Sequence, residues 1–409
     1  MPRERTAVVT AEEQLIRDAL GDVPVSLISR EPLGAGSVAG FTVEGADPAQ
    51  VYYVDTSGIT VDAETGMATG EDPAHPEARV WMHPADPHLP ALAPVAYAHA
   101  AEVLLDRLGI RATGPGDLIA YRPGRRAVVR IPAGEGTVWV KVVRPRRVRR
   151  IVDAHAACAS AGLPVPPVRG WSPEGLVVLA EAEGLPAPIA DWHPAGLIDA
   201  VDRLRPRIAA VRTSRRLTPV TDRLDWYATH SQGSADAMAL VERIRAGLAT
   251  LEPTAPVVVH GDLHFGQLFL SGDTITGLID VDTLGIGAAA EDPAAFVAHA
   301  LASAEQSPAE GRSRLRYLAG EALDRWGADP AVRIYAATHL LGHAIAARDL
   351  GDPQREDAML AGADRLLRQM NASNTRLRTV SRALSIALSP GGDDGGRTSA
   401  LADREEEWT

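Results

Sequence analysis

Several features that mark secreted and membrane proteins are missing from this sequence. Its 409 residues contain one cysteine, Cys158, so no intrachain disulfide can form, which is typical of a protein in a reducing compartment. No stretch approaches the roughly 20 consecutive apolar residues that span a bilayer. Residues 1–14 lack the apolar core of a signal peptide. These absences predict a cytoplasmic protein that does not enter a membrane.

Lysine is nearly absent as well, and the positive charge is unevenly distributed. Lys141 is the only lysine beside forty arginines, and the formal net charge is −12. Residues 121–150 hold nine Arg and Lys141 against Glu135, so this segment is +9 and the remainder is −21. The overall negative charge argues against general nucleic-acid binding. A nucleic-acid-binding arm at 121–150 is one interpretation, but a basic lobe that faces phosphate groups agrees better with the motifs described next.

Two acidic residues each follow a predicted β-strand. An apolar run at 257–259 leads to Asp262, and a second run at 274–279 leads to Asp280. The segment between them, with a turn at 271–273, is typical of a β-hairpin. We expect hairpin pairing to bring the two carboxylates to the same side.

Phosphoryl transfer needs this combination of side chains. One carboxylate accepts the proton of an attacking hydroxyl, while an amide oxygen and a second carboxylate hold magnesium against the triphosphate. Asp262 and Gln267 are five residues apart, as are the Asp and Asn of kinase catalytic loops, and Asp280 comes where the second metal-binding Asp is expected. The alternative is that these acids only cap turns. Two strand-terminal acids with an amide at this offset favour a kinase site.

The stretch HGDLHFGQ, followed by LIDVDT, resembles the aminoglycoside phosphotransferase/choline kinase-like family, whose pattern is His-Gly-Asp-x-x-x-x-Asn and then Ile-Asp. The resemblance implies a bilobal α+β fold like that of protein kinases, with ATP and Mg²⁺ as cofactors. It implies that Asp262 is the catalytic base and that Gln267 and Asp280 bind the metal. Gln267 departs from the usual Asn, and the maltokinase-like branch carries a similar HGDxHxGQ. Asp282 shares the metal, orients Asp280 or is solvated.

The same resemblance implies a nucleotide-binding sheet at residues 117–145. Three strands are predicted there, and the third carries Lys141, the position that pairs with the α/β phosphates in this fold. A compact charge among so many arginines favours that role over a solubilising lysine on an edge strand. The turn Pro123-Gly124 would lay backbone amides over the phosphates, assisted by Arg125 or Arg126. Solvated arginines on a hairpin tip are the alternative.

Chain order in this fold implies further nucleotide contacts. The helix predicted at 146–161 should carry the acid that pairs with the phosphate-binding lysine. Asp153 is the only acid there, and the family normally uses the longer Glu. The strand at 175–180 should end in the hinge, where backbone groups near Ala180 and Ala182 would bind adenine.

The N-terminal region predicts a separate α/β cap. A helix at 11–20 precedes strands within 25–61. The glycine-rich string at 33–43 is interpreted as a hairpin turn, because a nucleotide loop should lie on a strand adjacent to that of Lys141. Residues 71–94 are predicted to be a turn-rich surface connector rather than a metal site built from their His and Asp residues.

The second half of the chain is predicted to be mainly helical. His339 and His343 are four residues apart, and a packed helix contact is preferred to a zinc pair because the glutamate of HExxH is absent. From residue 390 the chain is rich in Gly and acids and is predicted to be disordered. Its Trp408 would fold back as a lid over a cationic acceptor, or the acidic end is simply solvated.

We therefore predict a cap domain at 1–95, a nucleotide-binding lobe and hinge at 96–182, a helical catalytic lobe at 183–389 and a disordered tail at 390–409. The predicted reaction is ATP-dependent phosphorylation of a hydroxyl on a sugar, aminosugar or aminoglycoside. The alternative is a nucleotide-binding pseudokinase without turnover. The expected partner is the small-molecule acceptor, with neither nucleic acid nor membrane involved.

Overall fold

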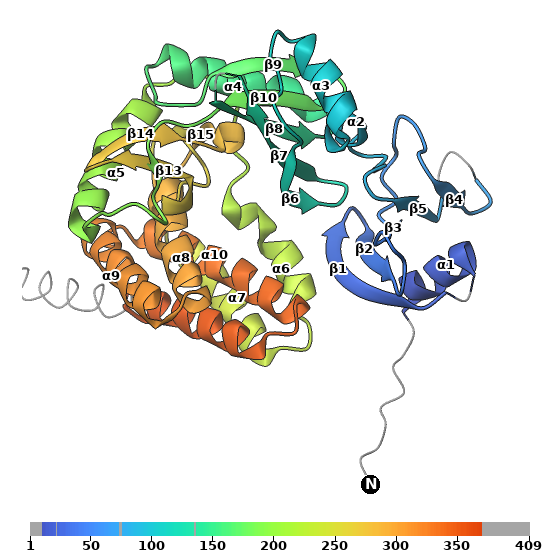
Figure 1. The fold of residues 1–409 in the computed structure, drawn as a ribbon. Coiled ribbons are helices and arrows are strands. Elements are labelled where there is room, and N and C mark those ends of the chain that lie inside the picture. The colour runs from blue at the N-terminus through green and yellow to red at the C-terminus, as the bar shows by residue number, and fades with distance from the viewer. Residues whose placement is uncertain (1–9, 22, 73–75, 135, 370–409) are drawn as a thin grey trace, which may run out of the picture.

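The computed structural model describes residues 10–21, 23–72, 76–134 and 136–369 (Figure 1). The predicted disordered tail and its Trp408 lie outside these residues. Within the described residues, no helix has the length and apolar character needed to cross a bilayer.

One helix and an antiparallel sheet form the N-terminal module, which we define as α1 and β1–β5 (Figure 1). Its strand order is β1-β2-β3-β5-β4. The apolar side of α1 packs on this sheet, where Ile16, Phe41 and Val54 are buried together. Thr10 caps the helix, because its hydroxyl accepts a hydrogen bond from the N–H of Glu13. The bounds are α1 Ala11–Leu20, β1 Val25–Leu33, β2 Gly36–Val43, β3 Val51–Asp55, β4 Met67–Thr69 and β5 Ala78–Met82.

The glycine-rich string is the β1–β2 hairpin, as predicted. Leu33 pairs with Gly36 across its turn. Gly34 has a φ of 55°, and a side chain there would collide with the carbonyl oxygen of Ser57.

Two predictions for the N-terminal region were wrong. Residues 58–61 form no strand, because local side chains bind their backbone: Asp55 accepts a hydrogen bond from the N–H of Ser57, and the Ser57 hydroxyl accepts one from Ile59. Residues 71–94 are not only surface turns, since β5 inserts between β3 and β4 and four of its five residues are buried.

Asp86 and His88 also differ from the predicted surface connector, since they are 1 % and 4 % exposed. They are buried because each has polar partners. His88 Nε2 lies 2.8 Å from Asp55 Oδ2, and Asp86 accepts a hydrogen bond from the hydroxyl of Tyr121.

A second five-stranded sheet has the order β6-β7-β8-β10-β9 and carries helices on both faces. Leu92 and Leu105, from α2 and α3, are buried against one face. Ile151 of α4 is buried with Val143 and Val177 against the other. The strands on either side of residues 123–124 confirm the predicted hairpin. The bounds are α2 Leu92–Ala96, α3 Ala98–Asp106, β6 Asp117–Arg122, β7 Arg126–Ala133, β8 Gly136–Val143, α4 Val148–Ser160, β9 Val168–Ser172 and β10 Leu176–Ala180.

Helices dominate the remainder of the described chain, around a core that includes Phe296, Leu318 and Leu340. A lobe built on a sheet is thus followed by a helical lobe, which confirms the bilobal α+β prediction (Figure 1). The helix bounds are α5 Pro194–Ala209, α6 Leu224–His230, α7 Ala235–Leu248, α8 Glu291–Gln306, α9 Ala309–Trp326 and α10 Pro330–Asp349. The strand bounds are β11 Leu185–Pro186, β12 Val257–Val259, β13 Leu268–Ser271, β14 Thr274–Leu278 and β15 Gly285–Gly287.

Two small sheets in the helical lobe position the predicted acids. The β13–β14 hairpin confirms the turn at 271–273, since Ser271 pairs with Thr274. The strand before Asp262 does not join this hairpin as expected. It is β12, and it pairs with β15, a strand that the sequence pattern did not reveal. Asp262 and Asp280 therefore follow strands of two different sheets.

Candidate functional site

Asp262 lies in a loop after β12 whose backbone is fixed by a helix. Asp292, in the first turn of α8, accepts hydrogen bonds from the N–H groups of His260 (2.9 Å) and Gly261 (2.7 Å). Gly261 has a φ of 83°, a left-handed conformation that glycine adopts without strain. The Thr283 hydroxyl donates a third hydrogen bond to the carbonyl of His260. The backbone immediately before Asp262 is therefore held on both sides.

Only one oxygen of the Asp262 carboxylate has a hydrogen-bond partner among the described residues. Its Oδ1 lies 3.2 Å from Nε2 of His299, which donates to it from α8. Burial alone would raise the pKa of Asp262, but the hydrogen bond from His299 and the nearby histidines outweigh burial and lower that pKa. The side chain is 37 % exposed, so an ionised carboxylate oxygen remains accessible to a substrate hydroxyl.

Four histidines gather beside Asp262. His264 stacks on His299 with 4.3 Å between ring centroids. The ring centroids of His343 and His339 lie 4.9 Å and 6.1 Å from that of His299. Burial lowers the pKa of His264 to about 4 and those of His339 and His343 to about 3, so these rings are neutral near pH 7. The pair on α10 thus packs as expected. Asp262, His264 and His299 also bring one ligand atom each within 4.8 Å of the others, an arrangement that could hold a cation.

Asp280 stands just after β14 in an uncommon backbone conformation. It is the only non-glycine residue in the described chain with a positive φ, 61°. Such strain persists where the surroundings fix a residue, and it clusters at functional sites. Lys141 Nζ donates to its Oδ1 at 2.7 Å, and Arg126 Nη1 lies 3.5 Å from its Oδ2. Burial would raise the pKa of Asp280, but the two cations lower it.

Lys141 also donates a hydrogen bond to Oδ2 of Asp282, so the ammonium group joins the two carboxylates. The carbonyl of Asp282 accepts from Arg150 and Arg215, at 3.1 Å and 2.6 Å. The second carboxylate of the motif is therefore buried beside the first and is not solvated. Its exposed fraction is 5 %.

The predicted metal ligands contain buried oxygens without a partner. Gln267 Oε1 and Asp282 Oδ1 are buried and accept no hydrogen bond from the described residues. The carbonyl of Gln267 accepts from the N–H of Ile279, which places it beside Asp280. An amide oxygen and carboxylates are the donor set that Mg²⁺ prefers, and orphaned buried oxygens are expected where an ion binds. These residues fit a magnesium ion.

Asp262 and Asp280 belong to one region of the molecule. Both carboxylates act on the pKa of His264, each raising it against the larger effect of burial. The segments that carry them are also in direct contact, because His260 Nε2 lies 3.2 Å from the carbonyl of Ile279 and the Thr283 hydroxyl donates to the carbonyl of His260. The residues just before Asp262 therefore pack against the segment that holds Asp280.

Asp153 does not pair with Lys141. Its side chain is 68 % exposed and lies 3.8 Å from Arg149, one turn earlier on α4. The expected pairing fails because Lys141 already has two carboxylate partners and Asp153 is on the solvent side of the helix. The acid that α4 was expected to supply comes instead from the loop after β14.

The Pro123-Gly124 turn is engaged by the N-terminal module. The N–H of Gly124 donates to Asp86 Oδ2 at 2.7 Å, so this amide is not free to bind a phosphate as predicted. The Arg125 side chain also points toward the N-terminal module, because it donates a hydrogen bond to the carbonyl of Pro32 in β1. Of the two arginines predicted at this turn, only Arg126 reaches Asp280.

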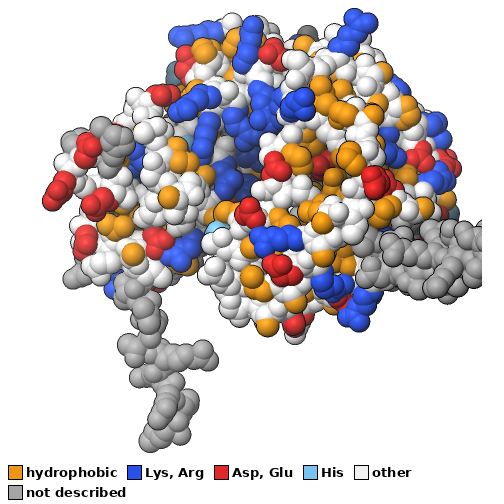
Figure 2. All heavy atoms as spheres, turned by 180° about the vertical axis from the view of Figure 1, so that it is seen from behind, with side chains coloured by type: hydrophobic (Ala, Val, Ile, Leu, Met, Phe, Trp, Pro, Cys, Tyr) orange, Lys and Arg blue, Asp and Glu red, His pale blue; other side chains and the backbone are white. Residues whose placement is uncertain are grey.

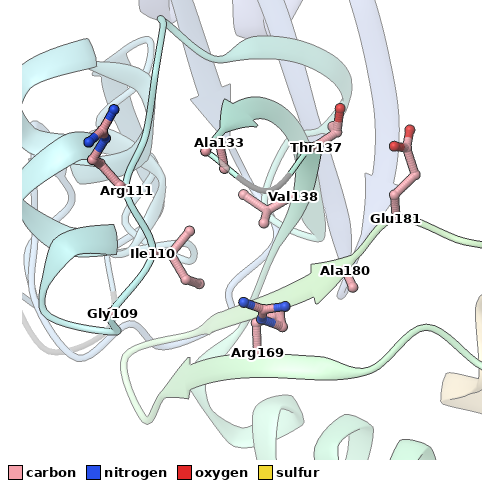
Figure 3. Close-up of a pocket in the computed structure, with 11 residues that line it drawn as sticks. Gly109, Ile110, Arg111, Ala133, Thr137, Val138, Arg169, Ala180 and Glu181 are labelled. Carbon is pink, nitrogen blue, oxygen red and sulfur yellow. The ribbon is translucent and has the colours of Figure 1, made fainter.

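The predicted hinge follows β10. Ala180 uses its own N–H for the carbonyl of Pro167. Ala180 and Glu181 line a cavity of about 290 Å³ together with Val138 and Arg169 (Figure 3). Val138 and Lys141 have opposite parity on β8, so this cavity lies on the other face of the sheet from the Lys141 ammonium. Ala182 lies farther along, next to Gly277 of β14.

Sequence reasoning missed His299, Asp292 as an anchor of the loop, Arg150 and Arg215. Asp292 carries a partial local signal, because an Asp followed by a Pro is typical of the start of a helix. His299 has no local signal, since it stands on a helix whose other residues are mostly buried and apolar. Its role depends on the packing of α8 against the loop.

The fold resembles that of known phosphotransferases. A thermostable mutant of aminoglycoside phosphotransferase APH(4)-Ia, apo form, is 15% identical with a TM-score of 0.50, covering 65% of this chain and 97% of that one. Another such mutant, in a ternary complex with AMP-PNP and hygromycin B, is 15% identical with a TM-score of 0.51, covering 66% and 98%. The macrolide 2′-phosphotransferase MphH from Brachybacterium faecium is 19% identical with a TM-score of 0.42, covering 64% and 97%.

Among curated proteins, none matches this chain significantly in sequence. The profile of the phosphotransferase enzyme family matches residues 71–333, a range that contains the loop of Asp262, the β13–β14 hairpin and Lys141. The structural similarity confirms the protein-kinase-like fold. The chain therefore belongs to the phosphotransferase enzyme family, as its motifs predicted.

Proposed function

We propose that this protein is a small-molecule kinase that transfers the γ-phosphoryl group of ATP to a hydroxyl of a sugar, aminosugar or aminoglycoside. The observation that carries the proposal is the convergence of Lys141, Asp280 and Asp282 beside the loop of Asp262. Family membership supports the reaction class, and the solved neighbours include one in complex with AMP-PNP and hygromycin B. Magnesium, held by Gln267, Asp280 and Asp282, would supply charge neutralisation at the phosphates.

Asp262 acts as the base in this proposal. Its lowered pKa keeps it ionised, and His299 occupies Oδ1 so that Oδ2 can accept the proton of the acceptor hydroxyl. Phosphoryl transfer passes through a loose transition state, so orientation of the hydroxyl contributes more than base strength.

Lys141 and Arg126 neutralise phosphate charge on the other side of the site. In the structure both cations lie on Asp280. A nucleotide would draw them toward its phosphates and free carboxylate oxygens for the metal. Ala182 would offer its backbone groups to adenine, whereas the N–H of Ala180 already donates to the carbonyl of Pro167. Arg125 and Asp153, which face away, are left without a proposed nucleotide contact.

The second candidate is a nucleotide-binding pseudokinase. Gln267 in place of Asn motivates it, as does the absence of an α4 partner for Lys141. We also propose that residue 95 ends the cap domain and that residue 182 ends the nucleotide-binding lobe and hinge. We propose a cytoplasmic location and a small-molecule hydroxyl acceptor as the partner. The comparisons leave the maltokinase-like branch a prediction.

One set of assays separates the candidates. Purified protein is incubated with MgATP over a panel of sugars, aminosugars and aminoglycosides, and ADP release is measured. We expect turnover with one class of acceptor. Asp262→Asn should lower kcat by about 10²-fold or more with MgATP binding retained. Asp273→Asn, in the exposed β13–β14 turn, is the matched control and should keep full activity.

Three results discriminate. MgATP binding without turnover on any acceptor would favour the pseudokinase. Undiminished turnover by Asp262→Asn would remove that residue from the proposed role. Failure to bind MgATP would contradict both candidates.

A further inference from the structure

The basic side chains of the arginine-rich segment at 121–150 lie at more than one site in the structure. Lys141 and Arg126 reach Asp280 at the predicted nucleotide site, and Arg150 donates to the carbonyl of Asp282. Arg144, Arg146 and Arg147 instead line a separate cavity between the N-terminal module and the second sheet. Figure 2, which views the molecule from behind, shows Lys and Arg side chains gathered in one area of the surface. This cluster is not accounted for by the proposed phosphoryl transfer.

The cavity has a volume of about 260 Å³. Its floor on the N-terminal side comes from residues 59–62, and its apolar wall includes Pro87 and Pro90. Asp62 is the only acid among the lining residues, against three arginines, so the lining has an excess of two positive charges. The cavity is therefore charged on one side and apolar on the other.

Arg144 presents an unsatisfied donor here. Its Nε donates to the carbonyl of Gly124 at 2.6 Å, whereas its Nη2 is buried and has no hydrogen-bond partner among the described residues. Burial lowers the pKa of Arg144, and Arg147 and Arg146 act in the same direction, whereas the carboxylates of Asp86 and Asp55 raise it. Neither neighbouring arginine forms an ion pair with a described acid. An anion in the cavity could pair with Arg146 and Arg147 and accept a hydrogen bond from Nη2 of Arg144.

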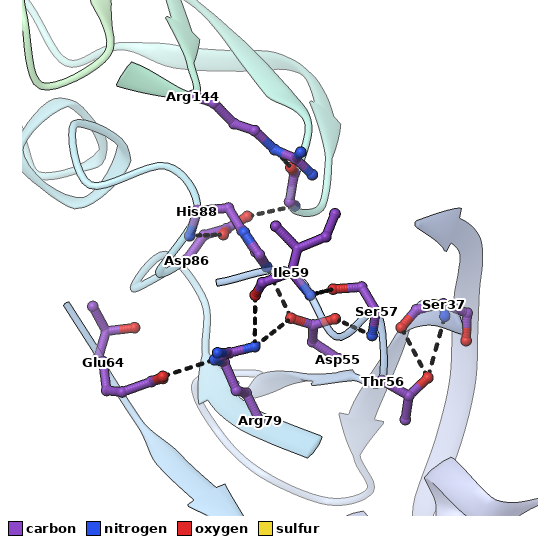
Figure 4. A network of polar contacts seen from close by, with 12 residues as sticks. Ser37, Asp55, Thr56, Ser57, Ile59, Glu64, Arg79, Asp86, His88 and Arg144 are labelled. Atoms are coloured by element: carbon purple, nitrogen blue, oxygen red, sulfur yellow. Dashed lines mark hydrogen bonds and ion pairs between the residues drawn. The ribbon is translucent and has the colours of Figure 1, made fainter. Parts of the chain in front are cut away.

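The opposite wall is held in place without any ligand. Arg79, 3 % exposed, donates to the carbonyl of Ile59 at 2.9 Å and to Glu64 at 2.8 Å, and its guanidinium also lies 3.6 Å from Asp55 (Figure 4). Asp55 in turn binds His88, another lining residue. Figure 4 shows Arg144 reaching from the second sheet toward this network. A preformed wall reduces the ordering cost of binding.

We propose that this cavity binds a small phosphate-bearing anion, at a site separate from the nucleotide site. Guanidinium groups recognise phosphate oxygens through paired hydrogen bonds. Ligand pockets for drug-sized molecules begin at about 300 Å³, so this smaller cavity suits a compound no larger than a monosaccharide phosphate. Because Arg144 also holds Gly124, an occupant would bear on the turn that precedes Arg126.

The test is calorimetric titration of the full chain with two probes, pyrophosphate and hexose 6-phosphate. The double variant Arg146→Ala/Arg147→Ala removes two lining charges whose side chains form no ion pair with a described acid. We expect it to bind about tenfold more weakly than the wild type. The control Arg130→Ala/Arg149→Ala removes two exposed charges from the same segment and should bind as the wild type does. Stronger binding of pyrophosphate would indicate an inorganic phosphate as the ligand, and stronger binding of hexose 6-phosphate would indicate an organic phosphate.

A second titration separates this cavity from the nucleotide site. Lys141→Met removes the predicted phosphate contact of that site, and probe binding should persist in this variant. The proposal is overturned if neither probe binds the wild type at millimolar concentration, or if both double variants lose the same affinity. It is overturned equally if Lys141→Met abolishes binding.

Discussion

Lys141 and Glu291 illustrate two outcomes for a buried charge. Lys141 is 8 % exposed, and Asp280 and Asp282 surround its ammonium group, so its charge is paired and hydrogen-bonded. Glu291, at the start of α8, is 1 % exposed and its Oε1 has no partner among the described residues. Burial, reinforced by Asp292, raises the pKa of Glu291 to about 7.

Glu291 should make the protein less stable as pH rises from about 4.5 to 7. Below this range the carboxyl is protonated in both the folded and the unfolded chain. Within it, the unfolded chain releases the proton while the folded chain retains it, so the free energy of unfolding falls with pH. Glu291→Gln has no proton to release and should be more stable than the wild type at pH 8, by an amount on the order of 3 kcal/mol.

Urea unfolding at pH 5 and pH 8 measures this difference. Glu310, exposed in the first turn of α9, provides the control for loss of an acid at a helix start. Glu310→Gln should shift stability equally at both pH values. If the free energies of unfolding of the wild type and of Glu291→Gln change in parallel between pH 5 and pH 8, Glu291 is not the source of the pH dependence.

At the scale of elements, α8 organises the site more than any strand does. Its first turn anchors the loop before Asp262 through Asp292, and two turns later His299 orients the Asp262 carboxylate. A rigid helix thus sets both the backbone and the side chain of the proposed base. Preorganisation of this kind is what positions a hydroxyl for in-line transfer.

Asp292→Ala should lower kcat with little change in the KM for ATP. The variant leaves the N–H groups of His260 and Gly261 without acceptors, and each buried orphan costs about 1–3 kcal/mol. The loop would shift until these N–H groups find other acceptors, and this shift would move the Asp262 carboxylate away from its present position. Steady-state kinetics with the acceptor found in the screen measures the effect, alongside circular dichroism to verify folding.

Asp329→Ala is the matched control, because Asp329 caps α10 by accepting from the N–H of Ala331. It should cost helix stability and leave kcat unchanged. If both variants lose activity in proportion to their stability, the loop of Asp262 does not depend on Asp292 in the way described.

At the scale of the whole molecule, the N-terminal module and the second sheet share a packed interface. Tyr121 of β6 meets the ring of Tyr53 at 5.4 Å between centroids and that of His83 at 5.0 Å. Its hydroxyl donates to Asp86 Oδ2 at 2.9 Å. Aromatic packing and a buried hydrogen bond therefore join the two sheets.

Tyr121→Ala should destabilise the protein by about 3–5 kcal/mol, because it leaves a cavity at this interface. Tyr121→Phe removes only the hydroxyl and should cost about 1 kcal/mol. Tyr97→Ala, at a tyrosine that is 58% exposed, should change stability little. Urea unfolding followed by tryptophan fluorescence and circular dichroism gives these values. Equal effects of Tyr121→Ala and Tyr97→Ala would show that the interface contributes little.

Local patterns predicted the fold and the motif residues, whereas long-range contacts were not predictable. Alternating apolar residues and turn signals located α1, the β1–β2, β6–β7 and β13–β14 hairpins, and the lobe order. The partner of β12, the interaction of Asp86 with Gly124 and the position of His299 depend on residues distant in sequence. β5 was missed because its residues are buried on both faces and show no alternation.

The scarcity of lysine has a practical consequence. Lys141 is the only side chain in the sequence with a primary amine, so an acylating or sulfonylating reagent aimed at amines has one internal target. Its ammonium group donates hydrogen bonds to Asp280 and Asp282, so a reagent must displace these contacts to reach it. Labelling of this single position, followed by mass spectrometry, would report directly on whether anything occupies the site around Lys141.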